Sequence, residues 1–161
     1  MQNSFTEIER KFLIDSFPAD LPLIRQHQVY QAYLSLDPEV RIRRNVKDGQ
    51  DTAYFLTIKS GHGLVREEVE LDISKAHFYA LAKMIKHPFV SKDFRVYQLP
   101  GGLELECSLV DKGKSSEFMY AEIEFPNVDA AKSFAVLPIF KKEVTEDSAY
   151  RMKNYWEKTR Y

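Results

Sequence analysis

The sequence predicts a mainly β protein with an antiparallel sheet and a few flanking helices. Two patterns carry this prediction. Apolar and polar residues alternate in eight separate segments, as side chains do on the two faces of a β-strand. Between these segments lie glycine, proline and aspartate residues of the kind that form tight turns. Three further segments change to a helical spacing of apolar residues, so an α+β arrangement dominated by strands follows.

The predicted strands follow one another closely along the chain. They are residues 7–14, 29–36, 40–47, 53–60, 64–72, 94–99, 103–110 and 119–125. Turn residues occur at 37–38, 47–49, 61–63, 100–102 and 111–113. Strands joined by such short turns pair as hairpins, and hairpins make an antiparallel sheet.

Three helices are predicted. The first begins after Ser74, a residue suited to the N-cap, and ends near Pro88. A shorter helix covers about residues 129–137, and a last one follows Thr145. We expect all three to pack on the outside of the sheet, with Tyr155 and Trp156 among the packing residues of the last helix.

Length, charge and cysteine content exclude several classes of protein. A chain of 161 residues suits one domain, which we place at residues 1–161. The 23 basic and 24 acidic residues give a net charge of −1, so binding of nucleic acid by bulk charge is not expected. No apolar run approaches the ~18–20 residues of a membrane span, and no secretory signal is recognised, so we expect a cytoplasmic protein without a membrane partner. Cys107, the single cysteine, can form neither an internal disulfide nor a thiolate cluster, so any metal must bind oxygen or nitrogen.

Charged residues occupy one face of almost every predicted strand, because residues at i and i+2 point the same way. The acids of this face are Glu7, Glu9, Glu68, Glu70, Glu104, Glu106, Glu122 and Glu124, and the bases are Lys11, Arg41, Arg43, Lys59, Arg66 and Arg95. Periodicity leaves two interpretations open. A half-buried sheet could carry these charges as ion pairs on its wet face, or the strands could close into a barrel with an ionic interior.

An ionic interior would have a specific chemistry. Arginine and lysine side chains bind phosphate oxygens, while clustered carboxylates would repel a polyphosphate unless they held a divalent cation. Acids for a metal and bases for phosphate occur together in phosphoryl transfer. The second interpretation therefore predicts a metal-assisted reaction of a polyphosphate.

The segment EIERKF at residues 7–12 places Glu7, Glu9 and Lys11 at the spacing Glu-x-Glu-x-Lys. In this motif the chain resembles the CYTH family, also called triphosphate tunnel metalloenzymes. The resemblance extends to QAYLS, VRIRR, FLTIKS, REEVEL, AEIEF and KEVTEDSAY, which cover nearly the whole chain. It implies an eight-stranded antiparallel closed β-barrel that forms a tunnel, and so favours the barrel over the half-buried sheet.

The resemblance also implies roles for individual residues. It implies that the ligands of the principal metal are Glu7, Glu9 and Glu124. The implied residues that bind phosphate oxygens are Lys11, Arg41, Arg43, Lys59 and Arg95, with Arg66 as a further candidate. The implied residues that position a second metal or the attacking water are Glu68, Glu70, Glu106 and Glu122. The sequence does not rank these four for either role. Glu106 stands where family members commonly carry Asp.

The expected activity is hydrolysis of a triphosphate, in first place inorganic tripolyphosphate, to pyrophosphate and phosphate with Mg²⁺ or Mn²⁺. An adenylate cyclase acting on ATP is the main alternative, and a polyphosphate-binding module without catalysis is the second. The expected partner is thus a small-molecule triphosphate, and we expect a homodimer.

Overall fold

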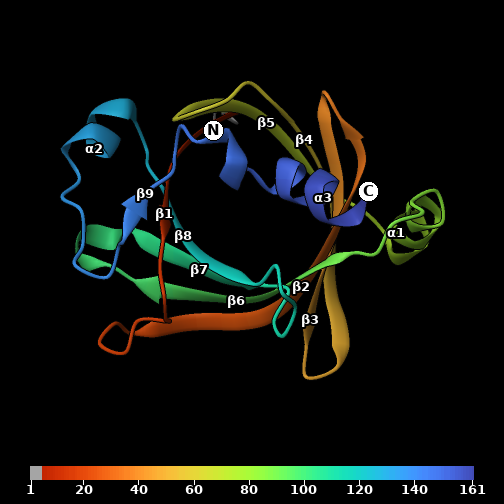
Figure 1. Cartoon of the computed structure of the whole chain (residues 1–161), viewed down its shortest axis with the longest axis horizontal. Helices are drawn as coiled ribbons and strands as arrows, with labels where there is room; N and C mark the ends of the chain where they lie inside the picture. The colour runs from red at the N-terminus through yellow and green to blue at the C-terminus, as the bar shows by residue number, and fades with distance from the viewer. Residues whose placement is uncertain (1–4) are drawn as a thin grey trace.

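Eight strands pair edge to edge into a closed barrel in the computed structural model, which describes residues 5–161 (Figure 1). Around the barrel the order is β5-β4-β3-β2-β6-β7-β8-β1, every pair is antiparallel, and β1 pairs again with β5. The strands are β1 (Thr6–Leu13), β2 (Leu23–Leu36), β3 (Glu39–Lys47), β4 (Gln50–Ser60), β5 (Val65–Asp72), β6 (Val90–Gln98), β7 (Glu104–Val110) and β8 (Phe118–Glu124). The predicted eight-stranded antiparallel barrel is confirmed.

Strand β1 closes the barrel by pairing on both of its edges. Its first residues pair with β5, where Glu7 lies opposite Arg66, and its later residues pair with β8, where Glu9 lies opposite Glu124. A ninth strand, β9 (Lys142–Glu143), pairs beside the end of β1. The sequence did not predict β9, because two residues are too few to show an alternation.

Two strands begin at least four residues earlier than the alternation indicated. Strand β2 begins at Leu23 instead of residue 29, and β6 begins at Val90 instead of residue 94. Both early parts contain polar side chains that face the inside of the barrel, including His27 and Lys92. A polar interior weakens the contrast between the two faces of a strand, which is the signal that alternation relies on.

The helices are shorter than predicted. Helix α1 (Lys75–Ala82) begins where Ser74 Oγ accepts a hydrogen bond from the His77 amide at 3.1 Å, but it ends well before Pro88. Helix α2 (Val128–Ser133) is capped by Asn127, whose side chain accepts from the Ala130 amide at 2.8 Å. None of the helices in the described part of the chain is long and apolar enough to cross a membrane.

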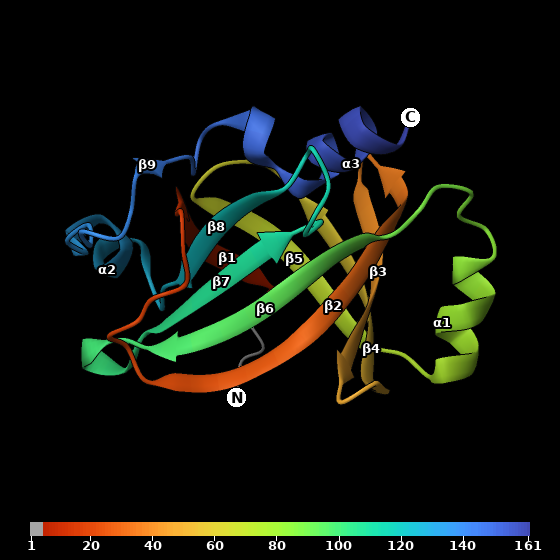
Figure 2. The same ribbon diagram turned by 60° about the horizontal axis from the view of Figure 1, so that its bottom comes forward.

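We expected the C-terminal helix to pack on the outside of the sheet. This expectation was wrong, because the C-terminal part lies across one end of the barrel (Figures 1 and 2). Here a 3₁₀ turn (Ser148–Tyr150) leads into helix α3 (Met152–Arg160). Figures 1 and 2 show α1 and α2 on opposite sides of the barrel and α3 across one of its ends. Helix α3 buries Trp156 against Tyr33 and Val110 at that end, which confirms Trp156 as a packing residue. The last helix is amphipathic, and its apolar side meets strand ends instead of the outer sheet face.

A buried ion pair attaches α3 to the barrel. The Asp111 carboxylate is fully buried and receives two hydrogen bonds from the Arg160 guanidinium, at 2.6 and 2.9 Å. It also accepts from the Tyr155 hydroxyl at 2.5 Å and from the Ser91 amide at 3.1 Å. Burial alone would raise the pKa of Asp111, but the hydrogen bonds from Arg160 and Tyr155 outweigh it and lower that pKa.

Candidate active site

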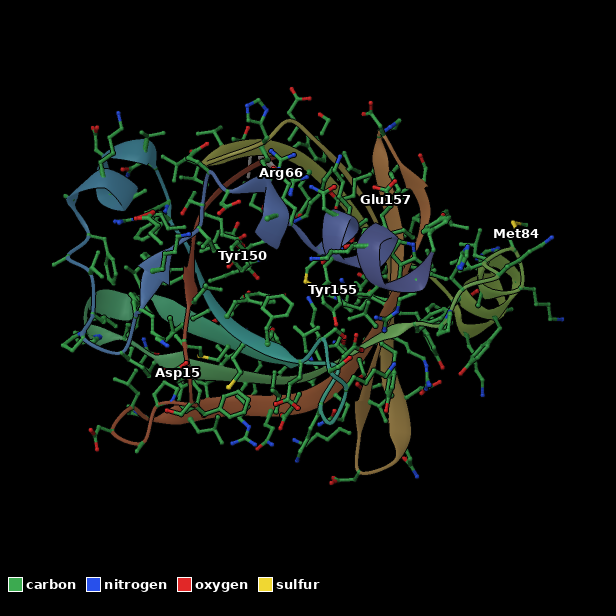
Figure 3. The ribbon with its side chains drawn as sticks, in the orientation of Figure 1. Asp15, Arg66, Met84, Tyr150, Tyr155 and Glu157 are labelled. Carbon is green, nitrogen blue, oxygen red and sulfur yellow. The ribbon has the colours of Figure 1, made fainter. Side chains whose placement is uncertain are left out.

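The inside of the barrel is a charged cavity of about 290 Å³. All eight barrel strands contribute side chains to it, and the C-terminal segment of residues 144–152 forms part of its wall. Figure 3 shows Arg66, from β5, and Tyr150, from the C-terminal segment, at the border of this interior. The cavity is therefore built from residues that are far apart in the sequence.

All the residues predicted for the site except Arg95 line this cavity. They are Glu7, Glu9, Lys11, Arg41, Arg43, Lys59, Arg66, Glu68, Glu70, Glu106, Glu122 and Glu124. The barrel thus brings acids and bases from six strands into one enclosed space. The parity of each strand, read from the sequence, is what places them on the inner face.

Arg95 is the exception, and the structure corrects the expectation that it faces the phosphates. Within β6, Lys92 and Phe94 line the cavity, so the neighbouring residue Arg95 points to the outer face. There its guanidinium pairs with Asp93 at 2.9 Å and lies over the ring of Phe17, 3.8 Å from the centroid. The error came from starting the strand at residue 94, where the inward-facing Lys92 was not yet counted.

Lys92 is the basic residue of β6 that reaches the cavity, and the sequence analysis missed it. Its ammonium donates a hydrogen bond to the Tyr120 hydroxyl at 2.6 Å. Burial, helped by the nearby charge of Arg41, lowers the pKa of Lys92 well below its usual range. Arg151 of the C-terminal segment also lines the cavity, and within residues 5–161 it makes no ion pair. An alternation read from Val90 would have found Lys92, but no local pattern indicates Arg151.

Three carboxylates meet in the cavity, from Glu9, Glu106 and Glu122, with one oxygen of each within 4.8 Å of the others. Burial and the charge of Glu122 raise the pKa of Glu9 well above its usual range. For Glu122, burial is outweighed by Lys11 and by a hydrogen bond with Glu9, which lower its pKa to about 2. The two carboxylates are joined by a hydrogen bond, in which burial favours the protonated form of Glu9 when no cation is present. An all-oxygen donor set with excess negative charge fits a hard divalent cation, which would replace that proton.

The structure groups the acids differently from the metal trio that the resemblance implied. Glu7 forms an ion pair with Lys59. The Lys59 ammonium lies 3.0 and 3.1 Å from the two carboxylate oxygens of Glu7 and 3.1 Å from Glu68. Burial still raises the pKa of Glu7 to about 7, against the opposing charge of Lys59. Glu124 lies opposite Glu9 in the barrel wall but outside the carboxylate trio. Of the implied metal ligands, only Glu9 belongs to the trio.

Three arginines present buried donors without acceptors. Within residues 5–161, the Nε atoms of Arg41, Arg43 and Arg66 are buried and have no hydrogen-bond partner. Other guanidinium nitrogens are engaged, by Glu39 for Arg66 at 2.7 Å and by Glu70 for Arg43 at 3.7 Å. A buried donor left without an acceptor costs about 1–3 kcal/mol. An oxyanion in the cavity would remove this cost, which favours a phosphate ligand beside these arginines.

Glu106 gives the metal-free protein a specific dependence of stability on pH. Burial, with repulsion from Glu122 and Glu124, raises the pKa of Glu106 from 4.5 to about 7. Between these two pH values the folded protein binds more protons than the unfolded chain, so the free energy of unfolding falls as pH rises through this interval. We expect Glu106→Gln to make this fall, measured in a chelator, smaller by about 2–3 kcal/mol. The raised pKa values of Glu7 and Glu9 account for the part that remains. Urea unfolding at about pH 5 and about pH 8 measures it, and equal pH slopes for the two proteins would contradict the buried, unpaired state of Glu106.

The fold and the cavity together define a closed β-barrel protein whose interior is suited to an anion and a cation at the same time. No family model matches the chain. It is 38% identical to an inorganic triphosphatase of Nitrosomonas europaea over 149 residues, which are 92% of this chain and 95% of that protein. The chain belongs to the family of this inorganic triphosphatase.

Solved structures agree with this assignment. A crystal structure of the inorganic triphosphatase NE1496 matches with a TM-score of 0.63 and 35% identity, over 92% of this chain and 93% of that one. An adenylyl cyclase-like protein from Hippeastrum, with a dominant triphosphatase activity, matches with a TM-score of 0.52 and 18% identity, over 78% of this chain and 82% of that one. The second match concerns the fold alone.

Proposed function

We propose that this protein is a CYTH, or triphosphate tunnel, metalloenzyme that hydrolyses inorganic tripolyphosphate to pyrophosphate and phosphate. One observation carries the proposal: buried arginine donors without acceptors and a carboxylate trio line the same cavity. The two charge types would serve the two parts of a metal–polyphosphate ligand. The 38% identity to an inorganic triphosphatase supports this substrate above other triphosphates.

The basic side chains would hold the phosphate oxygens. Arg41, Arg43 and Arg66 supply the planar donors, and lysine ammonium groups from Lys11, Lys59 and Lys92 add point charges around them. Most of these groups are tied to acids or hydroxyls, which fixes their position before the substrate arrives. Such preorganisation lowers the ordering cost of binding.

Glu9, Glu106 and Glu122 would hold a divalent cation, for which Mg²⁺ and Mn²⁺ are the candidates because both accept oxygen ligands. Glu7 and Glu124 flank this position on β1 and β8. When bound, the cation would offset the charge of the substrate and acidify a water molecule.

Glu106 is the strongest candidate to orient the attacking water from its place in the carboxylate trio. The other three predicted residues are engaged elsewhere, Glu68 by Lys59, Glu70 by the Thr57 hydroxyl at 2.9 Å, and Glu122 by Lys11 at 4.0 Å. Within residues 5–161, the Glu106 carboxylate makes no ion pair, so it is available to a cation and to the water beside it. The proton of the water would pass to the leaving pyrophosphate. The water oxygen would bond to a terminal phosphorus, the bridging P–O bond would break, and pyrophosphate would leave as phosphate forms.

A direct comparison of substrates tests the proposed function. Tripolyphosphate, ATP and thiamine triphosphate are each incubated with Mg²⁺ and with Mn²⁺, and phosphate, pyrophosphate and cyclic AMP are measured separately. We expect equal amounts of phosphate and pyrophosphate from tripolyphosphate, little product from ATP, and no product in a chelator. Cyclic AMP with pyrophosphate from ATP would make the protein an adenylate cyclase, and tripolyphosphate binding without any product would make it a binding module. The homodimer and the single-domain assignment of residues 1–161 stay predictions.

A further inference from the structure

Tyr120 lies between two lysines that come from different strands. It stands on β8 with 1% of its surface exposed, at the end of the cavity that α3 crosses. Its hydroxyl accepts the 2.6 Å hydrogen bond from Lys92 of β6. The ammonium of Lys11, from β1, lies over the same ring, 3.9 Å from its centroid. One side chain thus contacts both cations, through its edge and through its face.

The partner of each lysine decides how much positive charge stays available for a ligand. Lys59 lies between the carboxylates of Glu7 and Glu68, which neutralise it. Lys92 is held by a neutral hydroxyl. Lys11 is held by the face of a neutral ring and by a longer ion pair with Glu122, at 4.0 Å. A tyrosine orients an ammonium through its oxygen or its π-electrons without cancelling the charge. Two lysine amino groups placed in this way keep N–H donors free for a phosphate oxygen.

The ring is itself held in place, so that it can serve as a support. Tyr120 lies beside Phe118, with 5.6 Å between ring centroids, and belongs to the buried cluster that contains Met152 and Trp156 of α3. Its backbone pairs with Ser108 on β7. A rigid aromatic side chain loses little entropy when it fixes two flexible lysines, which otherwise lose much on ordering.

We propose that Tyr120 is a positioning residue of the phosphate site, which holds the ammonium groups of Lys11 and Lys92 towards the substrate. The inference rests on the proposed function, because the phosphate is the ligand that the two lysines would bind. In this role Tyr120 itself does not contact the reacting atoms. Its effect passes through the lysines, through the hydroxyl for Lys92 and through the ring for Lys11.

A double-mutant cycle tests the link between the hydroxyl and Lys92. The variants are Tyr120→Phe, Lys92→Met and both together, and the measurement is KM and kcat for tripolyphosphate. Tyr120→Phe should raise KM about tenfold, the loss expected for a hydrogen bond of a charged group, with a smaller change in kcat. In the Lys92→Met background it should have no further effect on KM, because Lys92 is the partner through which the hydroxyl acts on the substrate. The hydroxyl also bonds to the side chain of Ser108, so Tm is measured for each variant beside KM. Tyr120→Leu, which also removes the ring under Lys11, should raise KM more than Tyr120→Phe.

Tyr155→Phe is the matched control. It also removes a buried tyrosine hydroxyl, the one bonded to Asp111 at 2.5 Å, but this hydroxyl lies outside the cavity. We expect a lower Tm and an unchanged KM, so a loss of stability alone does not imitate the effect of Tyr120→Phe. The positioning role is overturned if Tyr120→Phe leaves KM unchanged, or if its effect and that of Lys92→Met are independent.

The same variants separate this inference from the proposed function. If the wild-type protein hydrolyses no tripolyphosphate, the rise in Tm that tripolyphosphate produces is compared among them. Tyr120→Phe should then lose part of the rise that Lys92→Met loses, and equal rises in all variants would overturn the positioning role. Hydrolysis by the wild type with an unaffected Tyr120→Phe would overturn the positioning role and leave the proposed function intact.

Discussion

Glu9→Gln is expected to lower kcat/KM for tripolyphosphate by at least about a hundredfold, because it removes one charge from the carboxylate trio. The amide keeps the size of the side chain but binds a divalent cation weakly. The arginine donors are unchanged, so tripolyphosphate should still bind. Initial rates with Mg²⁺, together with a titration of the protein with Mn²⁺, measure the two parts of the effect.

Glu104→Gln is the control for this change. Glu104 is not among the residues that line the charged cavity, and it pairs with Arg25 at 2.9 Å on an exposed part of the surface. The same loss of charge should therefore leave kcat/KM close to the wild-type value. Equal activity of Glu9→Gln and Glu104→Gln would show that the trio does not hold the catalytic metal. An inert parent protein that binds tripolyphosphate would favour the binding module instead.

Arg160→Met is expected to give the largest loss of stability, about 3–5 kcal/mol in the free energy of unfolding, because Asp111 would stay buried without its cation. For a chain of this size such a loss corresponds to a decrease in Tm of roughly 6–20 °C. The effect belongs to the ionised form of Asp111. Since the native pKa of Asp111 is lowered, the stability that the pair contributes is present above the ordinary pKa of Asp and is lost as pH falls through the native pKa.

Two variants check that the buried pair carries this loss. Arg25→Met breaks an exposed pair, with side chains 45% and 41% exposed, and should cost less than about 1 kcal/mol. Adding Asp111→Asn to Arg160→Met should recover part of the loss, because it removes the unpaired charge. Urea unfolding at neutral pH compares the three proteins with the wild type. A loss as small as that of Arg25→Met would contradict the attachment of α3 by this pair.

Local patterns in the sequence predicted much of the fold and many of the residues of the site. Alternation located all eight barrel strands, and within β1 it placed Glu7, Glu9 and Lys11 on one face. Parity is a local property, because neighbouring side chains on a strand must point to opposite faces. For that reason the inward-facing residues could be named before any strand pairing was known, and the Glu-x-Glu-x-Lys motif could be matched to a family.

Tertiary structure alone decided which of these side chains meet. Closure of the barrel through β1 and β5, and the stagger of the strands around it, bring Glu106 and Glu122 to Glu9 while Glu7 goes to Lys59. Lys92 faces the cavity and Arg95 does not. This difference depends on the start of β6 at Val90, which the weak alternation of its polar inner face did not indicate. The C-terminal segment becomes a wall of the cavity because α3 packs on strand ends. These features arise from contacts between distant segments, and alternation along one strand carries no information about the register of another.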